Sequence, residues 1–360
     1  MPTARASIVA VLAFVAGCAG YARPVEPRPR PPRPSGPAPS FTLTAFDVGT
    51  GLAVFVRGED FTLLYDGGSN DDRKLGPDNR LLAYLRPALG PPDAAECADE
   101  DAPRSNESSR TLDHLFLSHP HRDHLQLLPD VLRCHHVANV WESGLEGDTA
   151  GYRTFRDAIT SERGVVHHVG GRDFTSGHSF RLGRSASAVV LSVRPDAKEP
   201  NDASIVLRLD LGGTRVLLMG DATGGERRVP EAPPDRGSTE QSLLSLGRKA
   251  LAADVLVVGH HGSKTSTRAA LLDAVRPKVA VVSSGPMPYA GVVLPDRDII
   301  DLLVSRGIKV HRTDESDDKC RDAESKVGRD HDGSPGGCSA VTVEVERGTL
   351  MRVTHEPASD

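Results

Sequence analysis

One short stretch of the chain contains four potential metal ligands within six residues. The run His119-Pro-His121-Arg-Asp123-His124 directly follows residues 115–118, an apolar segment that predicts a β-strand. Imidazole and carboxylate groups with this spacing, across a tight turn from a strand to a helix, can converge on one point. Both groups are ligands for Zn²⁺, Mn²⁺ or Fe²⁺. The stretch therefore predicts a metal site formed by His119, His121, Asp123 and His124.

The remaining apolar pattern predicts two series of strands, each followed by an alternation of helices and strands. Strands are expected at 41–46, 53–57, 61–65, 112–118, 137–141, 189–193, 204–209, 215–219, 255–258 and 279–282, and a closing hairpin at 340–346 and 350–354. Helices are expected at 81–89, 125–133, 152–163, 243–251, 269–275 and 299–306. The acidic and polar residues 71–111 look like a surface insertion. This order predicts an α/β protein built as an αββα four-layer sandwich.

Six further segments accompany the histidine motif along the chain. They are Asp47-Val-Gly-Thr-Gly51, Tyr65-Asp66-Gly-Gly68, Val140-Trp-Glu-Ser-Gly144, Asn201-Asp-Ala-Ser204, Met219-Gly-Asp221 and His260-His-Gly-Ser263. Together with the motif, they resemble metallo-β-lactamase-fold hydrolases, and among these the C-terminal hydrolase domain of ComEC-type DNA-uptake proteins. The resemblance covers residues 41–312. It does not extend to the multi-spanning membrane channel of those proteins, so only their hydrolase module is expected here.

The resemblance also implies the ligands of a centre with two divalent metal ions, Zn²⁺ or Mn²⁺. Asp221 matches the carboxylate that bridges the two ions. One histidine of the pair His260 and His261 would complete the second position with Asp123 and His124. We assign this role to His261, which leaves His260 to contact the substrate.

The first metal position, built on His119, His121 and Asp221, looks short of one ligand. Many members of the wider fold supply a third histidine from a loop between the two halves, but residues 193–195 contain none. Other histidines offer no aligned substitute. His167, His168 and His178 lie upstream of that loop, and His135 and His136 are expected to cap a helix or to lie at the surface.

Several residues near these ligands are candidates for supporting roles. Asp66 follows a strand, and its carboxylate can orient a metal-bound imidazole while the adjacent glycines allow close backbone approach. Asp47 could act similarly or form a turn, and Asn201 could contact a substrate oxygen or form a turn. Residues 262–266 can form a nest for an anion, with Lys264 neutralising a phosphate. Ser263 or Ser266 could also cap the next helix.

The first 24 residues have the features of an export signal. Arg5 precedes the apolar residues 8–16, which are too few for a stable membrane span, and Val15-Ala16-Gly17-Cys18 resembles a bacterial lipobox. We therefore expect a signal peptide at 1–17, a lipidated Cys18 with a proline-rich tether at 18–40, and a hydrolase domain at 41–360. An ordinary signal peptide is the alternative. A lipid anchor, with no transmembrane domain in the mature protein, would place it in the cell envelope, at the outer membrane or in the periplasm.

Four cysteines remain after Cys18, and an even number in an exported chain permits two disulfides. Cys320 and Cys338 flank a loop rich in Gly, Asp and Ser and form the most plausible pair, which leaves Cys97 for Cys134. A cysteine metal site is the weaker alternative because no C-x-x-C spacing occurs.

The expected reaction is hydrolysis by a metal-bound hydroxide, with Asp123, Asp221 and His261 as the catalytic residues. The motif set favours a phosphodiester substrate, possibly DNA, and therefore a phosphodiesterase or nuclease. A formal net charge of −6 argues against binding of polyanions through bulk positive charge alone. The alternatives are hydrolysis of a β-lactam, lactone or thioester, or a catalytically silent binding module of the envelope.

Overall fold

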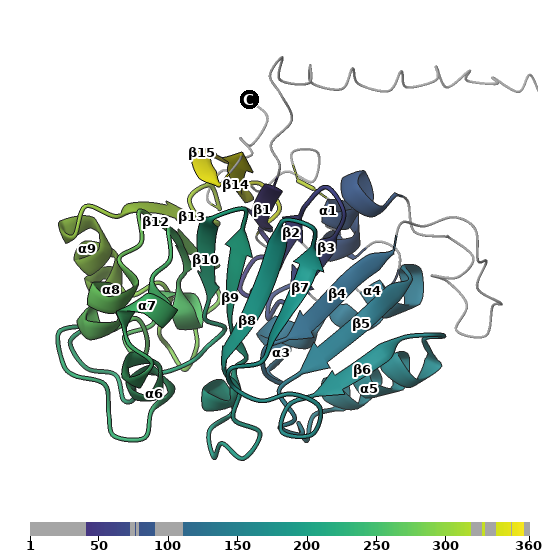
Figure 1. The fold of residues 1–360 in the computed structure, drawn as a ribbon, viewed down its shortest axis with the longest axis horizontal. Helices are drawn as coiled ribbons and strands as arrows, with labels where there is room; N and C mark the ends of the chain where they lie inside the picture. The colour runs from purple at the N-terminus through teal and green to yellow at the C-terminus, as the bar shows by residue number, and fades with distance from the viewer. Residues whose placement is uncertain are drawn as a thin grey trace, which may run out of the picture. The chain divides into compact units, whose positions relative to one another are not determined.

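Two β-sheets form the centre of the fold (Figure 1). The computed structural model describes residues 41–72, 76, 79–90, 111–317, 326–327, 336–346 and 348–355. The first sheet has eight described strands in the order β15 (Thr349–His355), β14 (Val341–Glu346), β1 (Phe41–Ala45), β2 (Val54–Arg57), β3 (Thr62–Tyr65), β4 (Leu112–Leu117), β5 (Val137–Glu142) and β6 (Val166–Val169). Strands β3 to β6 run parallel, whereas β15 to β3 pair antiparallel.

The second sheet has the same division into an antiparallel and a parallel part. Its seven described strands are β13 (Lys309–Arg312), β12 (Val279–Val282), β11 (Val255–Val257), β10 (Thr214–Leu218), β9 (Val206–Leu211), β8 (Ala186–Ser192) and β7 (Ser179–Gly183). Strands β10 to β13 run parallel, and β7 to β10 pair antiparallel. Each sheet therefore has a set of parallel strands whose carboxyl ends share one edge.

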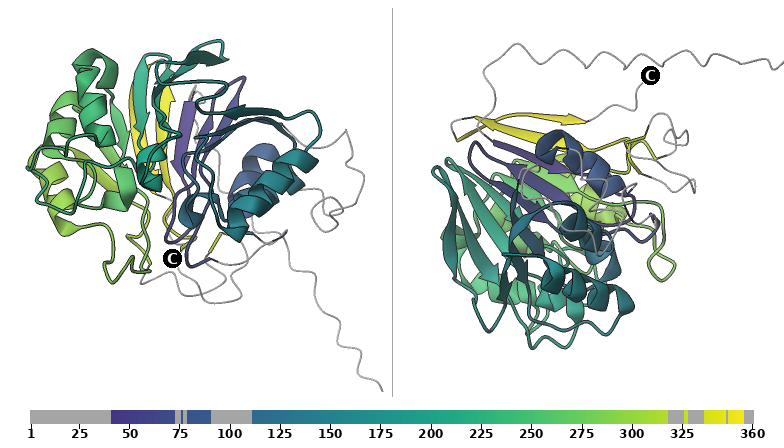
Figure 2. Two further views of the ribbon diagram at one scale, coloured as in Figure 1. Left: turned by 90° about the horizontal axis from the view of Figure 1, so that it is seen from below. Right: turned by 90° about the vertical axis from the view of Figure 1, so that its right-hand side faces the viewer.

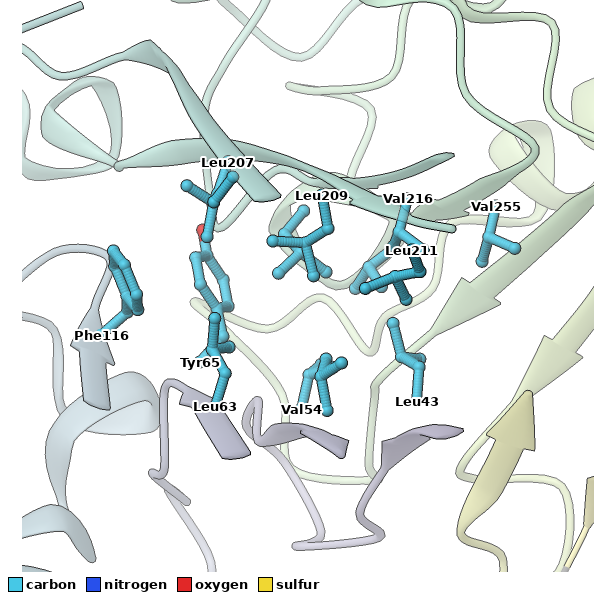
Figure 3. Close-up of a cluster of buried hydrophobic side chains, with 14 of the residues drawn as sticks. Leu43, Val54, Leu63, Tyr65, Phe116, Leu207, Leu209, Leu211, Val216 and Val255 are labelled. Atoms are coloured by element: carbon cyan, nitrogen blue, oxygen red, sulfur yellow. The ribbon is translucent and has the colours of Figure 1, made fainter. Parts of the chain in front are cut away.

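Apolar side chains from the facing surfaces of both sheets fill the space between them (Figure 3). In the close-up, Leu43, Val54 and Leu63 point towards Leu207 and Leu209, and all five are fully buried. This arrangement follows from the alternation in the sequence, because every second residue of a strand faces the same side. A hydrogen bond also joins the two sheets, since the Tyr65 hydroxyl donates to the Ile205 carbonyl at 2.7 Å.

Helices cover the outer face of each sheet, as the turned view shows (Figure 2, left). On the first sheet they are α1 (Arg80–Leu89), α3 (Arg122–Leu125), α4 (Leu128–Cys134) and α5 (Ala150–Ser161). On the second they are α6 (Thr239–Ser245), α7 (Arg248–Leu251), α8 (Ala269–Val275) and α9 (Arg297–Ser305). Short 3₁₀ helices occur at η1 (Pro200–Ala203) and η2 (Gly259–Gly262). The αββα sandwich predicted from the sequence is confirmed.

The sequence analysis did not predict three strands, and all three lie at sheet edges. β6 ends the first sheet, and β13 and β7 are the two ends of the second. An edge strand pairs on one side only and buries little of its surface, so it needs no long apolar run. β6 (Val-His-His-Val) and β13 (Lys-Val-His-Arg) accordingly contain no fully buried residue.

Two predicted helices are each divided in the structure. Residues 243–251 contain Gly247, whose φ of 76° separates α6 from α7. Residues 125–133 contain Pro129, which lies in the first turn of α4, a helix that begins at Leu128 after α3 has ended at Leu125. The described part of 71–111 is also not purely a surface insertion, because Leu81, Leu82 and Leu85 of α1 are buried in the core.

The described residues test the predictions on disulfides and on the membrane anchor only in part. Cys134 and Cys338 are each disulfide-bonded, but Cys97 and Cys320 lie outside the described residues, so the pairing stays a prediction. Residues 1–40, with Cys18 and the predicted tether, lie outside them too. Among the described helices, none has the length and apolar character needed to cross a bilayer.

Candidate metal centre

The predicted ligands lie at the carboxyl ends of parallel strands from both sheets. The histidine motif follows β4 and continues into α3. Asp221 follows β10, and His260 and His261 form η2 directly after β11. Since parallel strands end at one edge of a sheet, these segments meet there although His119 and His261 are 142 residues apart in the sequence.

Four buried residues form the more complete of two clusters. We call this four-residue cluster the second metal position. Asp123, His124, Asp221 and His261 each offer a ligand atom, and these atoms lie within 4.8 Å of one another. His124 Nε2 lies 3.1 Å from Asp221 Oδ1, and His261 Nε2 lies 3.3 Å from Asp123 Oδ2. Two ligands bonded to zinc at about 2.1 Å with tetrahedral angles lie about 3.4 Å apart. The spacing therefore fits one shared ion.

The other cluster is the first metal position. It consists of His119, His121 and Asp221. His119 Nε2 lies 3.9 Å from Asp221 Oδ2, and the His119 and His121 rings meet edge to face with centroids 4.6 Å apart. The two oxygens of Asp221 thus face different clusters. This division is the geometry that a carboxylate shared by two ions requires.

Each buried imidazole of the centre has a hydrogen-bond partner at Nδ1 and none among the described residues at Nε2. His124 Nδ1 is 2.9 Å from Asp66 Oδ2, and His261 Nδ1 donates to the Ser283 carbonyl at 2.9 Å. His119 Nδ1 is 3.0 Å from Ser118 Oγ. The three Nε2 atoms and Asp221 Oδ1 are buried without a hydrogen-bond partner among the described residues. Four such atoms facing one another fit a metal centre better than a structural hydrogen-bond network.

The electrostatics of the centre also favour a bound cation. Burial lowers the pKa of the His119 imidazole well below its usual range, so this ring is neutral and able to bind a metal. For His124 and Asp221, burial shifts the pKa in the opposite direction to the charges of the neighbouring groups. The carboxylates of Asp221 and Asp66 raise the pKa of His124 overall, and the surrounding imidazoles lower the pKa of Asp221 overall. The raised pKa of His124 shows that the carboxylates favour a positive charge here, and the lowered pKa of Asp221 keeps this carboxylate ionised and able to bind a divalent ion.

The backbone around the motif is packed too closely for side chains. A Cβ atom on Gly68 would lie 2.4 Å from the backbone of Asp123 and His124, and the Gly67 N–H donates to the His124 carbonyl at 2.7 Å. The close approach predicted for the Asp66-Gly-Gly segment is therefore present. Asp66 has a φ of 61°, and such strained residues concentrate at functional sites.

The two other predicted supporting residues contact different partners. The Asp47 carboxylate accepts hydrogen bonds from the backbone N–H groups of Gly49, Cys338 and Ser339, so its described contacts are those of a loop-forming residue. Asn201 lies in η1 with its Nδ2 at 3.3 Å from His260 Nε2, and its Oδ1 is buried without a partner among the described residues. Asn201 is therefore beside the centre, and Asp47 is not placed against its imidazoles.

The segment predicted as an anion nest is occupied by the protein's own carboxylates. Asp296 accepts the Lys264 N–H at 2.8 Å, and the Lys264 ammonium pairs with Asp298 at 3.0 Å. The predicted helix caps are wrong, because α8 begins after Arg268, which has no side-chain cap. Glu240 instead accepts the N–H groups of Thr267 and Arg268 just before the helix. Ser263 Oγ accepts hydrogen bonds within its own loop.

The five other histidines considered in the sequence analysis are absent from both clusters of the described residues. His167 contacts Glu142, and His168 stacks on Trp141 with ring centroids 3.8 Å apart. His178 lies in the same aromatic cluster. His136 is half-exposed and pairs with Glu162. His135 follows α4 but is buried rather than at the surface, and neither ring nitrogen has a partner among the described residues.

Tyr289 is a residue of the centre that the sequence analysis missed. Its hydroxyl donates to Asp123 Oδ2 at 2.7 Å, and its ring stacks on His261 with centroids 5.6 Å apart. Burial and the Asp123 carboxylate raise the pKa of Tyr289, so the phenol stays protonated and donates. One signal was available, because residue 289 follows β12, the parallel neighbour of β11, and such loops end at the same edge.

An αββα sandwich with a histidine and aspartate centre at its strand ends defines the class of metallo-β-lactamase-fold proteins. Residues 46–285 match the model of the metallo-beta-lactamase superfamily, and the chain belongs to this superfamily. The motif-based resemblance is thereby confirmed.

Three curated relatives are similar to this chain. They are Recombination protein 2 of Haemophilus influenzae (28% identical over 69% of this chain and 24% of the relative), ComE operon protein 3 of Bacillus subtilis (28%, over 58% and 24%) and Competence protein ComA of Neisseria gonorrhoeae (29%, over 76% and 31%). The chain thus spans only a quarter to a third of the length of these relatives.

Proposed function

We propose that this chain is a metal-dependent phosphodiesterase that is exported and anchored to the cell envelope by a lipid. The observation that carries the proposal is the set of buried atoms around Asp221, in which three imidazole Nε2 atoms face a carboxylate without hydrogen-bond partners among the described residues. Such a set suits two divalent ions, Zn²⁺ or Mn²⁺.

Each residue has a defined task in the proposed centre. His119, His121 and Asp221 would hold one ion, and Asp123, His124, Asp221 and His261 would hold the other. Bound divalent ions supply Lewis acidity and an activated water for hydrolysis. Asp66, Ser283 and Ser118 fix the imidazoles through Nδ1, so that each ring presents its Nε2 lone pair to the centre.

The partly exposed residues indicate the side from which substrate would arrive. His121, Asn201 and His260 are each partly exposed, whereas the ligands of the second metal position are buried. We infer that substrate reaches the centre from the side of the first metal position. Asn201 is placed there to contact a substrate oxygen. Lys264 is already paired with Asp298, so it would contact a phosphate only by leaving that partner.

The choice of a phosphodiester substrate rests on the relatives. Two of them are named for competence or its operon and one for recombination, processes that handle DNA. Because the chain spans a minor part of each relative, DNA as the substrate is part of the proposal. The negative net charge means that a DNA strand would be bound through local contacts at the centre rather than through a basic surface.

The activity test uses the full chain loaded with Mn²⁺ or Zn²⁺. We expect cleavage of bis-p-nitrophenyl phosphate and of single-stranded DNA, with no turnover of the β-lactam nitrocefin. His121→Ala should abolish cleavage, and His136→Ala should leave it unchanged, since His136 lies outside the centre. Turnover of nitrocefin without phosphodiester cleavage, or no turnover of any substrate, would contradict the proposal.

The anchor is tested separately. Palmitate labelling of cells expressing the full chain should label the protein in the envelope fraction, and Cys18→Ser should remove the label and release the protein from membranes. An unlabelled wild-type protein would favour the ordinary signal peptide.

A further inference from the structure

The first metal position has three ligands in its cluster, and His260 faces the same oxygen of Asp221 that this cluster uses. His260 Nε2 lies 3.6 Å from Asp221 Oδ2, and His119 Nε2 lies 3.9 Å from that atom. On the other side, His124 and His261 face Asp221 Oδ1 at 3.1 and 3.7 Å. Each oxygen of Asp221 therefore faces two Nε2 atoms, one from the histidine motif and one from η2.

The hydrogen bonds of His260 leave the lone pair of Nε2 on the side of the centre. Nδ1 lies 2.6 Å from Thr265 Oγ1, and the Thr265 hydroxyl donates to Ser263 Oγ at 2.9 Å. Because that hydroxyl proton is already used, Thr265 Oγ1 accepts the proton of Nδ1. The Asn201 amide at 3.3 Å then donates towards Nε2. A metal ion would take the place of this long Asn201 contact, and a ring held at Nδ1 with Nε2 on the side of the centre is the usual arrangement of a metal-binding histidine.

The backbone of η2 fixes this orientation. His260 has φ 52° and ψ 46°, a left-handed conformation that is strained for a residue with a side chain. Its N–H donates to the Gly220 carbonyl at 3.0 Å, which ties it to the turn that carries Asp221.

We propose that His260 is the fourth protein ligand of the first metal position and replaces the histidine that is missing from residues 193–195. This inference rests on the dinuclear centre of the proposed function. His260 does not belong to the atoms that lie within 4.8 Å of one another, so a rotation of its ring towards Asp221 would be needed for Nε2 to reach the ion. Thr265 and Ser263 position the ring.

The test counts metal ions in a His260→Gly variant, since glycine adopts the required positive φ without strain. After loading with Co²⁺ and desalting, the wild type should retain about two ions per chain and the variant about one. The d–d absorption of the lost ion should return when imidazole is added, because free imidazole can occupy the vacated place. His136→Ala, a histidine variant outside the centre, should retain both ions.

A second variant keeps the imidazole and tests its positioning. Thr265→Val removes the hydrogen-bond acceptor at His260 Nδ1 and should lower the affinity for one of the two ions by about 10-fold or more. Retention of both ions by His260→Gly, or absence of an imidazole effect on its spectrum, would overturn the inference. The proposed function fails by a different result, namely a wild type that holds two ions but cleaves no phosphodiester.

Discussion

The two metal positions share Asp221 but differ in how completely the protein encloses them. The second position has four buried ligands and two imidazoles fixed by Asp66 and Ser283. The first has three ligands in its cluster and includes the partly exposed His121. A closed set of protein ligands favours firm binding, whereas a catalytic ion keeps an open place for water or substrate. We infer that the second position holds its ion more tightly and that the first meets the substrate.

The largest effect is expected from Asp221→Ala, which removes the residue that both positions share. The variant should lose both ions and about 10³-fold or more of the hydrolytic rate, because each ion contributes several kcal/mol to the reaction. Metal analysis and a kinetic assay check this. The control is Asp210→Asn near the end of β9, where the partly exposed carboxylate pairs with Arg215. This variant should keep both ions and the full rate. A variant that lost a single ion would show that the positions do not share Asp221.

Single-ligand variants should separate the positions. His261→Ala should lose the tighter ion and His119→Ala the weaker one, because each imidazole faces a different oxygen of Asp221. Calorimetric titration with Zn²⁺ resolves the two binding steps. If both variants lost the same step, the two clusters would be one site.

Asp66→Asn should weaken the second position alone. The carboxylate holds His124 Nδ1 at 2.9 Å, and loss of such a partner typically lowers metal affinity by about 10–100-fold. Asp47→Asn is the matched control, since its described partners are backbone N–H groups. It should lower the thermal midpoint and leave metal affinity unchanged. Equal losses of affinity in both variants would place Asp47 beside the centre as well.

Tyr289→Phe should have a smaller effect on the same position. It removes the hydroxyl that donates to Asp123 but keeps the ring stacked on His261, and a partly exposed hydrogen bond contributes about 1 kcal/mol. We expect about 5-fold weaker binding of the tighter ion, measured in the same titration. Weaker binding of the looser ion with unchanged binding of the tighter ion would contradict this assignment.

The smallest effect on metal binding is expected from His135→Leu, which tests a buried histidine outside the centre. Burial lowers the pKa of His135 from 6.5 to about 4, so the unfolded chain binds a proton between these values while the folded chain does not. His135 therefore costs stability as pH falls from about 6.5 to about 4. The variant should show a flatter thermal midpoint across this range and an unchanged number of ions at neutral pH. An equally steep midpoint would show that His135 does not titrate in this way.

The sequence predicted the parts of this molecule that local chemistry determines. The four candidate ligands of the histidine motif and the central strands follow from residue type and spacing, whereas Asp221 was assigned through the resemblance to metallo-β-lactamase-fold hydrolases. Tyr289 did not, because its role depends on the position of a loop after β12, which no local pattern encodes. The edge strands β6, β7 and β13 were missed because an edge strand requires no apolar run.

Tertiary contacts also decided the residues around Lys264. Its sequence allows an anion nest or a helix cap, but Asp296 and Glu240 arrive from other segments and take the N–H groups. The ligand positions are thus predictable from the sequence where ligands cluster within a few residues. The contacts that orient them are not, since those come from across the fold.

The most direct test of a centre shared through Asp221 is an anomalous-difference map of crystals of the full chain loaded with Zn²⁺. We expect two peaks about 3.5–4 Å apart on either side of Asp221, with the stronger peak between His124 and His261. A single peak, or a pair of which only one contacts Asp221, would contradict the account.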